Sequence, residues 1–322
     1  MANANASPSR LEGRPLGKTR LLVTPLCIGT SPLASMPTLY GYEVDASRAV
    51  ATVRAALDSP ISFMDTSNGY GEGESERRIG QAIREVGGLP DGFVLATKVD
   101  PAPRSRDFSA ARVRASVEES LERLGLDHLH LLYIHDPERI SFEEGMAAGG
   151  PVQELIALKN EGLVDNIGVA GGPIDLMIRY VATGEFDVVL THNRFTLVDR
   201  SAEPLLREAT SRSVGVVNAA PFGGGMLAKG PSTRASYAYG QGDSSVQARA
   251  LEMQAICERY EIPLAAAALQ FSTRESRISS TVVGVSSPER IDQMLDLFEI
   301  PIPAELWDEL TPLAGSPSAW LG

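Results

Sequence analysis

Short apolar runs alternate along this chain with longer stretches in which apolar residues recur every three or four positions. The short runs have the length and composition of buried β-strands. They lie at residues 23–29, 61–65, 93–98, 130–135, 165–170, 186–192, 214–220 and 280–285. The intervening stretches, such as 45–58, 74–86, 109–125 and 152–162, have the spacing of amphipathic helices. The pattern predicts eight strand-helix units, one after another.

Strands this apolar cannot face water, so we expect the parallel sheet to be closed and covered by helices. The fold class is therefore α/β, and the predicted architecture is a (β/α)8 TIM barrel. An open, doubly wound sheet is the alternative, but it would need a GxGxxG motif after the first strand, and residues 27–35 read CIGTSPLAS. We expect one barrel over residues 16–322, preceded by a flexible tail at residues 1–15.

Two segments depart from the simple repeat. A long loop rich in Gly and Ser follows the seventh strand, at residues 221–246, and loops of this length in a compact domain usually carry function. An extra C-terminal helix is predicted near residues 303–314, beyond the eighth unit. The sequence leaves open whether the tail at 315–322 closes a barrel end or reaches toward a substrate.

Charge and composition narrow the possible partners. The formal net charge of -12 would repel a phosphate backbone, so nucleic acid is not expected as a partner. No signal peptide and no run of 18 apolar residues is present, which predicts a cytoplasmic protein without a membrane partner. Cys27 and Cys257 lie in apolar stretches without metal-binding spacing, so we expect two buried thiols and no metal site.

Four polar residues end consecutive predicted strands or follow them directly. They are Asp65, Tyr70, Lys98 and His135. In a (β/α)8 barrel the active site lies at the carboxyl ends of the strands, so these side chains should meet there. Each has an ordinary structural alternative, such as a turn residue for Tyr70, a helix cap for Asp65 or a core residue for His135. Their shared position favours catalysis.

Lys98 ends an apolar run, where an unpaired ammonium would be costly to bury. Asp65 on the adjacent strand is expected to pair with it. Lys98 is also expected to lower the pKa of the Tyr70 hydroxyl by roughly two units, because a cation about 4 Å away stabilises a phenolate. Tyr70 would then transfer the proton, and His135 would hydrogen-bond the substrate oxygen.

The stretch DTSNGYGEGESERRIG at residues 65–80 resembles a signature of the aldo-keto reductases. The resemblance continues at residues 94–99, 121–137, 152–169 and 281–295, in the family's order, and spans residues 16–312. It implies a (β/α)8 barrel enzyme that moves a hydride between a nicotinamide cofactor and a small-molecule substrate. It also implies that Tyr70 is the general acid/base, that Asp65 and Lys98 tune it, and that His135 orients the substrate.

The same resemblance implies a set of cofactor contacts at strand ends and in the loop after the seventh strand. They are Gly29, Thr30, Asn193, Ala220, Pro221, Phe222, Gly223, Gly225, Ser286, Ser287 and Arg290.

Several cofactor positions depart from the family. Ala170 and Gly171 replace a Ser-Asn pair that holds the nicotinamide carboxamide, and Ala219 stands where many members stack a Tyr on the ring. Three residues at the end of the sixth strand could compensate for the missing pair: Thr191, His192 and Asn193. Arg290 could bind a 2′-phosphate, but Gly284 replaces the nearby Lys, so both NADP and NAD remain candidates.

Residues 186–200 and 214–231 resemble the aldose, galactose and fucose 1-dehydrogenase and pyridoxal 4-dehydrogenase branch. This implies oxidation of an aldose at C1 to its lactone, with pyridoxal 4-dehydrogenase or a general aldehyde reductase as alternatives. A cofactor-sensing regulatory barrel is an alternative from another class.

A metal-dependent hydrolase is disfavoured, because His128 and His130 have opposite strand parity to His135. The exact substrate, the direction of reaction and the oligomeric state are left open.

Overall fold

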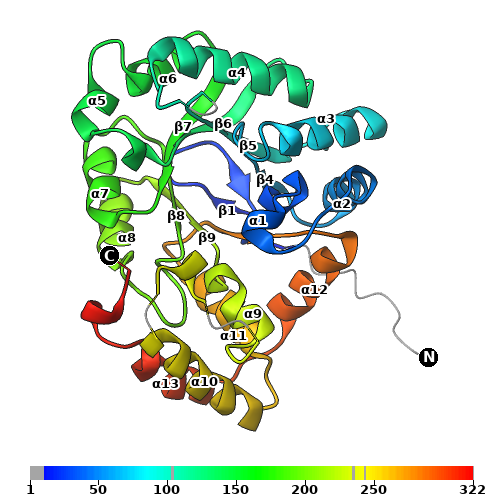
Figure 1. Ribbon diagram of the computed structural model, residues 1–322, viewed down its shortest axis with the longest axis vertical. Helices are drawn as coiled ribbons and strands as arrows, with labels where there is room; N and C mark the ends of the chain where they lie inside the picture. The colour runs from blue at the N-terminus through cyan, green and yellow to red at the C-terminus, as the bar shows by residue number, and fades with distance from the viewer. Residues whose placement is uncertain (1–10, 103–104, 234–235, 243, 322) are drawn as a thin grey trace.

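The computed structural model describes residues 11–102, 105–233, 236–242 and 244–321. Eight parallel strands close into a barrel in which each strand pairs with the next along the chain and the last pairs with the first (Figure 1). They are β3 (Leu26–Gly29), β4 (Phe63–Asp65), β5 (Val94–Val99), β6 (Leu129–His135), β7 (Val164–Gly171), β8 (Val188–His192), β9 (Gly215–Ala219) and β10 (Ser280–Gly284). The predicted (β/α)8 fold is confirmed.

Helices surround the barrel and bury their apolar faces against it (Figure 1). The main ones are α2 (Ala46–Asp58), α3 (Glu74–Val86), α4 (Ala110–Leu124), α6 (Pro151–Asn160), α7 (Ile174–Ala182), α8 (Glu203–Ser211), α11 (Leu264–Thr273) and α12 (Pro288–Glu299). Their limits follow local chemistry. The Asp45 side chain caps the start of α2 by accepting from a backbone N–H, and Ser109 does the same for α4. Gly87, in the left-handed region, ends α3.

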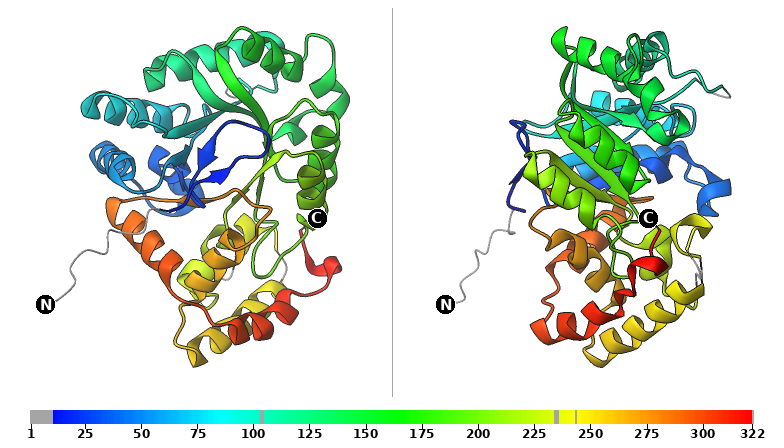
Figure 2. Two further views of the ribbon diagram at one scale, coloured as in Figure 1. Left: turned by 180° about the vertical axis from the view of Figure 1, so that it is seen from behind. Right: turned by 90° about the vertical axis from the view of Figure 1, so that its left-hand side faces the viewer.

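A short antiparallel hairpin lies at the amino ends of the barrel strands. It is formed by β1 (Arg14–Pro15) and β2 (Leu22–Val23), and it is the dark blue segment crossing the barrel in the left view of Figure 2. Leu16 and Val23 are fully buried in the barrel interior. Regular structure therefore begins inside the expected tail of residues 1–15, because these apolar side chains anchor the hairpin. Residues 1–10 of that tail lie outside the described residues.

The loop after β9 is less irregular than its composition suggests. It contains η3 (Gly223–Gly225), α9 (Met226–Lys229) and η4 (Ala238–Gly240), and it leads into α10 (Ser244–Arg259). The predicted extra helix is present as α13 (Ala304–Leu310), followed by η5 (Thr311–Ala314) and η6 (Pro317–Ala319). These elements share a second apolar cluster, below the barrel in Figure 1.

The carboxyl-terminal tail takes neither of the two paths left open by the sequence. The Leu321 backbone N–H donates to Asp199, in the loop after β8, at 2.7 Å, and the Trp320 indole donates to the Ala314 carbonyl. The tail is therefore held against that loop, and residues 315–321 do not line the pocket at the carboxyl ends of the strands. Four short elements complete the fold: η1 (Ser31–Ala34), α1 (Pro37–Tyr40), η2 (Pro137–Arg139) and α5 (Phe142–Met146).

Within the described ranges, each helix is too short or too polar to cross a lipid bilayer. Cys27 and Cys257 are buried free thiols, as expected from their apolar surroundings.

Candidate active site

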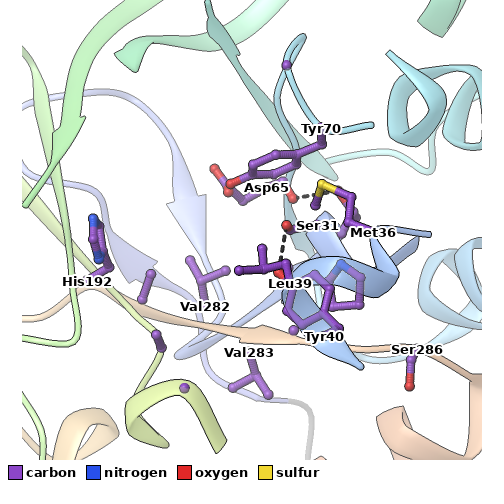
Figure 3. A pocket seen from close by; sticks show the side chains of 18 of the residues that line it. Ser31, Met36, Leu39, Tyr40, Asp65, Tyr70, His192, Val282, Val283 and Ser286 are labelled. Atoms are coloured by element: carbon purple, nitrogen blue, oxygen red, sulfur yellow. Dashed lines mark hydrogen bonds between the residues drawn. The ribbon is translucent and has the colours of Figure 1, made fainter. Parts of the chain in front are cut away.

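A pocket of about 1160 Å³ opens at the carboxyl ends of the barrel strands. Asp65, Tyr70, Lys98 and His135 all line it, so the structure brings the four predicted side chains together. Figure 3 shows Tyr70 above Asp65 on one side of the pocket and His192 across from them. This placement follows from the barrel, whose parallel strands all end at the same rim.

Lys98 is buried, and each of its three ammonium hydrogens has an acceptor. The Lys98 Nζ atom lies 2.5 Å from Asp65 Oδ1, 2.7 Å from the Thr66 carbonyl oxygen and 3.3 Å from the Tyr70 hydroxyl. The expected ion pair with Asp65 is therefore present. Because Lys98 donates to the Tyr70 oxygen, the phenol hydrogen is free to point toward a substrate.

The expectation that the pKa of Tyr70 lies below its ordinary value is wrong. Burial raises the pKa of the Tyr70 hydroxyl well above its ordinary value, and the charges of Asp65, Asp100 and Asp136 raise it further. Asp65 offsets much of the Lys98 charge at 2.5 Å. The site alone therefore keeps Tyr70 protonated at neutral pH.

His135 is held by two side chains that the sequence reasoning did not single out. Its Nδ1 atom lies 2.8 Å from Asp100 Oδ1 and 3.1 Å from the Ser67 hydroxyl. Strand alternation could have indicated Asp100, since it stands two residues after Lys98 and so continues the same side of β5. Ser67 carried no comparable signal, because it follows β4 in a loop.

A polar wall lies beside His135, made by Asp136, Arg139 and His192, all of which line the pocket. Asp136 Oδ1 is 3.7 Å from His135 Nε2, and Arg139 pairs with the Asp136 carboxylate at 2.8 Å. Although burial opposes ionisation, the charges of His135, Arg139 and His192 lower the pKa of Asp136. Burial lowers the pKa of His192 to about 4. The wall thus offers a carboxylate beside a neutral imidazole.

Aromatic and apolar side chains form the pocket rim. Leu39, Tyr42 and Tyr239 line the pocket and are each more than a third exposed. The Lys229 ammonium lies 5.9 Å from the Tyr42 ring centroid. The rim can therefore contact a ring or the apolar face of a sugar.

Most of the cofactor positions implied by the sequence also line this pocket. They are Gly29, Thr30, Asn193, Ala220, Pro221, Phe222, Gly225, Ser286 and Arg290. Gly223 does not, because it packs against the Tyr237 ring, where an added Cβ would come within 2.1 Å of a ring carbon. Ser287 is buried at the start of α12 and is likewise outside the lining.

The pocket fits a nicotinamide cofactor at two places. Asn193 is 1% exposed, and its Oδ1 atom has no hydrogen-bond partner among the described residues, so it can accept from a carboxamide N–H. Thr191 does not line the pocket, which leaves Asn193 and His192 as the residues able to replace the Ser-Asn pair. Gly224 and Gly225 have positive φ angles of 69° and 99°, which lets the loop backbone approach a pyrophosphate closely.

Of the three histidines that prompted the hydrolase alternative, His128 and His130 have ring centroids 5.3 Å apart, but His135 lies at the other end of β6. His128 precedes the strand, His130 lies near its start and His135 ends it. In the part of the chain that the structure describes, no group of three His, Cys, Asp or Glu side chains is arranged to hold a metal ion. The geometry gives that alternative no support.

The chain matches the Aldo/keto reductase family over residues 25–314. It is 34% identical over 286 residues to D-threo-aldose 1-dehydrogenase of a Pseudomonas species, covering 81% of this chain and 86% of the relative. L-galactose dehydrogenase of Arabidopsis thaliana is 34% identical over 289 residues, covering 88% and 87%. Pyridoxal 4-dehydrogenase of Microbacterium luteolum is 31% identical over 336 residues, covering 93% and 96%.

Among solved structures, an aldo-keto reductase of Bacillus halodurans in its holo form has the same fold. The TM-score is 0.76 at 22% identity, and the match covers 95% of this chain and 97% of that one. At this identity the likeness concerns the barrel alone.

Proposed function

This chain belongs to the aldo/keto reductase family, and from that premise we propose that it oxidises an aldose at C1 to the corresponding lactone. The family assignment made from the motifs is confirmed, and the chain is an NAD(P)-dependent oxidoreductase. The sugar substrate is supported by the similarity to aldose and galactose dehydrogenases. The observation that carries it is the polar wall beside His135.

In the proposed reaction, Tyr70 takes the proton of the C1 hydroxyl. Lys98 donates to the Tyr70 oxygen at 3.3 Å and so stabilises the phenolate that must exist before the proton moves. When bound, the oxidised nicotinamide ring supplies the acceptor for the hydride that leaves C1. His135 holds the substrate oxygen, and Asn193 with the loop at 220–225 would hold the cofactor.

The polar wall suits a substrate with several hydroxyl groups. An ionised carboxylate such as Asp136 accepts hydrogen bonds from two hydroxyls. The neutral His192 ring accepts from the Asn193 amide at Nδ1, at 3.2 Å, so its Nε2–H can donate to a third. An apolar aldehyde would leave these groups desolvated without partners. The wall therefore favours an aldose over a simple aldehyde.

A substrate screen tests the proposal. Purified protein is mixed with NAD or NADP and with aldoses including L-galactose and D-arabinose, pyridoxal or simple aldehydes, and the reduction or oxidation of the cofactor is followed. Aldose-dependent cofactor reduction with lactone formation is expected. Turnover of simple aldehydes alone, or tight cofactor binding without turnover of any compound, would refute the aldose proposal; the second result would favour a cofactor-sensing role.

Pyridoxal is the second candidate substrate. The pyridoxal 4-dehydrogenase relative aligns over 93% of this chain, and the exposed rings of Tyr42 and Tyr239 at the rim could stack on a planar pyridine. Oxidation of pyridoxal without oxidation of any aldose would select it.

The raised pKa of Tyr70 predicts the pH dependence of oxidation. Below that pKa the phenolate fraction grows tenfold for each unit of pH, so kcat/KM should rise about tenfold per unit until another catalytic group loses its proton. A pH-rate profile at saturating cofactor measures this. A profile without any rising limb would show that the phenol ionises readily in the complex.

Asp136→Asn tests the polar wall. Loss of a hydrogen bond to a charged group costs about 2 kcal/mol, so we expect KM for the aldose to rise roughly thirty-fold with a smaller change in kcat. Asp91→Asn, at an exposed turn, is the matched control. An unchanged KM in the Asp136 variant would remove this residue from substrate binding.

A further inference from the structure

Asp100 is a buried carboxylate in the pocket for which the proposed reaction has so far provided no role. It follows the last residue of β5 and is 5% exposed. Pro101 comes next, and a residue before proline is restricted to extended backbone, so Asp100 continues the direction of the strand. Its side chain therefore enters the pocket on the same side as Lys98.

Both carboxylate oxygens of Asp100 are occupied. Oδ1 lies 2.8 Å from His135 Nδ1, while Oδ2 accepts the Ser67 hydroxyl and the Gly69 backbone N–H, the latter at 2.8 Å. A Cβ at Gly69 would lie 2.7 Å from the Asp100 Cγ atom, so this approach needs a glycine. The carboxylate is thus fixed against the histidine ring.

Ser67, His135 and Asp100 do not form the relay of a serine hydrolase. In that relay the serine and the carboxylate bind opposite ring nitrogens, whereas here both contact Nδ1. The Nε2 atom is left on the pocket side, 3.7 Å from Asp136. The arrangement leaves that atom available for a substrate.

We propose that Asp100 is a positioning residue for His135. The Asp100 carboxylate accepts the hydrogen on His135 Nδ1 and thereby turns Nε2 toward the substrate oxygen. This inference deepens the proposed dehydrogenase function and rests on it. Because an ionised carboxylate only accepts hydrogen bonds, Nδ1 must carry a hydrogen. Nε2 can then donate to a substrate oxygen only when the ring carries a second hydrogen and is cationic.

Charged and titratable groups face His135 from several elements. From β5 and its end come Lys98 and Asp100, and from β4 and the loop after it come Asp65 and Tyr70. The segment after β6 contributes Asp136, Glu138 and Arg139, and β8 contributes His192. Although burial opposes protonation, Asp100 and Asp136 outweigh it and raise the pKa of His135. The same contact lowers the pKa of Asp100 despite its burial.

The charge on the His135 ring decides whether the hydrogen of the substrate hydroxyl points toward Tyr70 or toward His135. When Nε2–H donates to the substrate oxygen, the hydroxyl hydrogen is free to point at Tyr70. A neutral ring with its hydrogen on Nδ1 would instead accept that hydrogen and draw it away from Tyr70. Oxidation therefore requires cationic His135 and ionised Tyr70, and kcat/KM should rise with pH until His135 loses its proton, then become level.

Asp100→Asn removes the negative charge and keeps the shape. The pKa of His135 should fall by roughly one to three units, the effect of losing an opposite charge at this distance. The pH at which kcat/KM stops rising and becomes level, called the break, should shift to lower pH by the same number of units. The level part should fall by roughly ten- to a thousand-fold. An unchanged break and an unchanged His135 titration in a folded variant would overturn the proposal.

Asp165→Asn is the matched control, since it removes a carboxylate 3.7 Å from His128 at the other end of β6 and should leave the break in place. Titration of ring signals by NMR is practical because the chain has four histidines, and His135→Gln identifies the relevant signal. This titration needs no substrate, so it still tests Asp100 if the aldose proposal fails.

The wild-type protein supplies a further measurement if the Asp100 variant does not fold. Above its pKa, His135 should carry its hydrogen on Nδ1, which nitrogen chemical shifts report directly. Finding the hydrogen on Nε2 in that state would refute the role assigned to Asp100.

Discussion

Tyr70→Phe is expected to reduce kcat by roughly two to four orders of magnitude, the usual contribution of a general acid or base. The substitution removes the hydroxyl that accepts from Lys98 and leaves the ring, which also contacts His135 edge to face. The affinity for the cofactor should change little. Steady-state kinetics combined with cofactor titration separates the two quantities.

Tyr260→Phe is the control for this prediction, because the Tyr260 hydroxyl bonds Glu309 outside the pocket. It should retain wild-type activity. If the Tyr70 variant kept more than a tenth of wild-type kcat, another group would have to transfer the proton.

Lys98→Met is expected to destabilise the fold by about 3–5 kcal/mol, because it leaves the Asp65 carboxylate buried without its cation. The double variant Lys98→Met with Asp65→Asn removes both charges and should recover much of that stability. Both variants should lack activity, because neither has the ammonium beside Tyr70. Denaturant unfolding and turnover assays measure the two effects.

The comparison of single and double variants is the informative one. Equal stability of the two would mean that the Asp65 carboxylate tolerates isolation, for example by taking a proton. Burial already raises the pKa of Asp65, with Lys98 opposing the rise. We therefore expect the loss of stability in Lys98→Met to be smaller in acid, where Asp65 is protonated.

The position of the four candidate catalytic residues could be predicted because it depends on periodicity and topology. Asp65, Lys98 and His135 each end an apolar run and Tyr70 follows in a loop, and parallel strands in a closed barrel end at a common rim. The pairing of Asp65 with Lys98 followed from neighbouring strands and the cost of a buried charge. The α3 helix at 74–86 was equally readable, because its apolar spacing and its terminal glycine are local features.

The contacts around those residues were harder to predict from the sequence. Asp100 lies beyond the last residue of β5, and its contact with His135 depends on how two strand ends and the loop with Ser67 meet. The orphaned Asn193 oxygen and the outward position of Thr191 likewise depend on where β8 ends and the chain turns, with Asn193 at a φ of 59°. Spacing in the sequence could place Asp100 on the Lys98 side of β5, but it gave no sign of the contact with His135 or of the unpartnered Asn193 oxygen.

By itself the sequence determined the barrel, the family and the set of polar side chains that gather at its rim, because these follow from repeating patterns and local motifs. Tertiary structure alone decided the protonation of Tyr70 and the partner of His135. A pKa depends on every charge within several ångströms and on burial, and carboxylates from separate loops converge on this pocket only once the barrel closes.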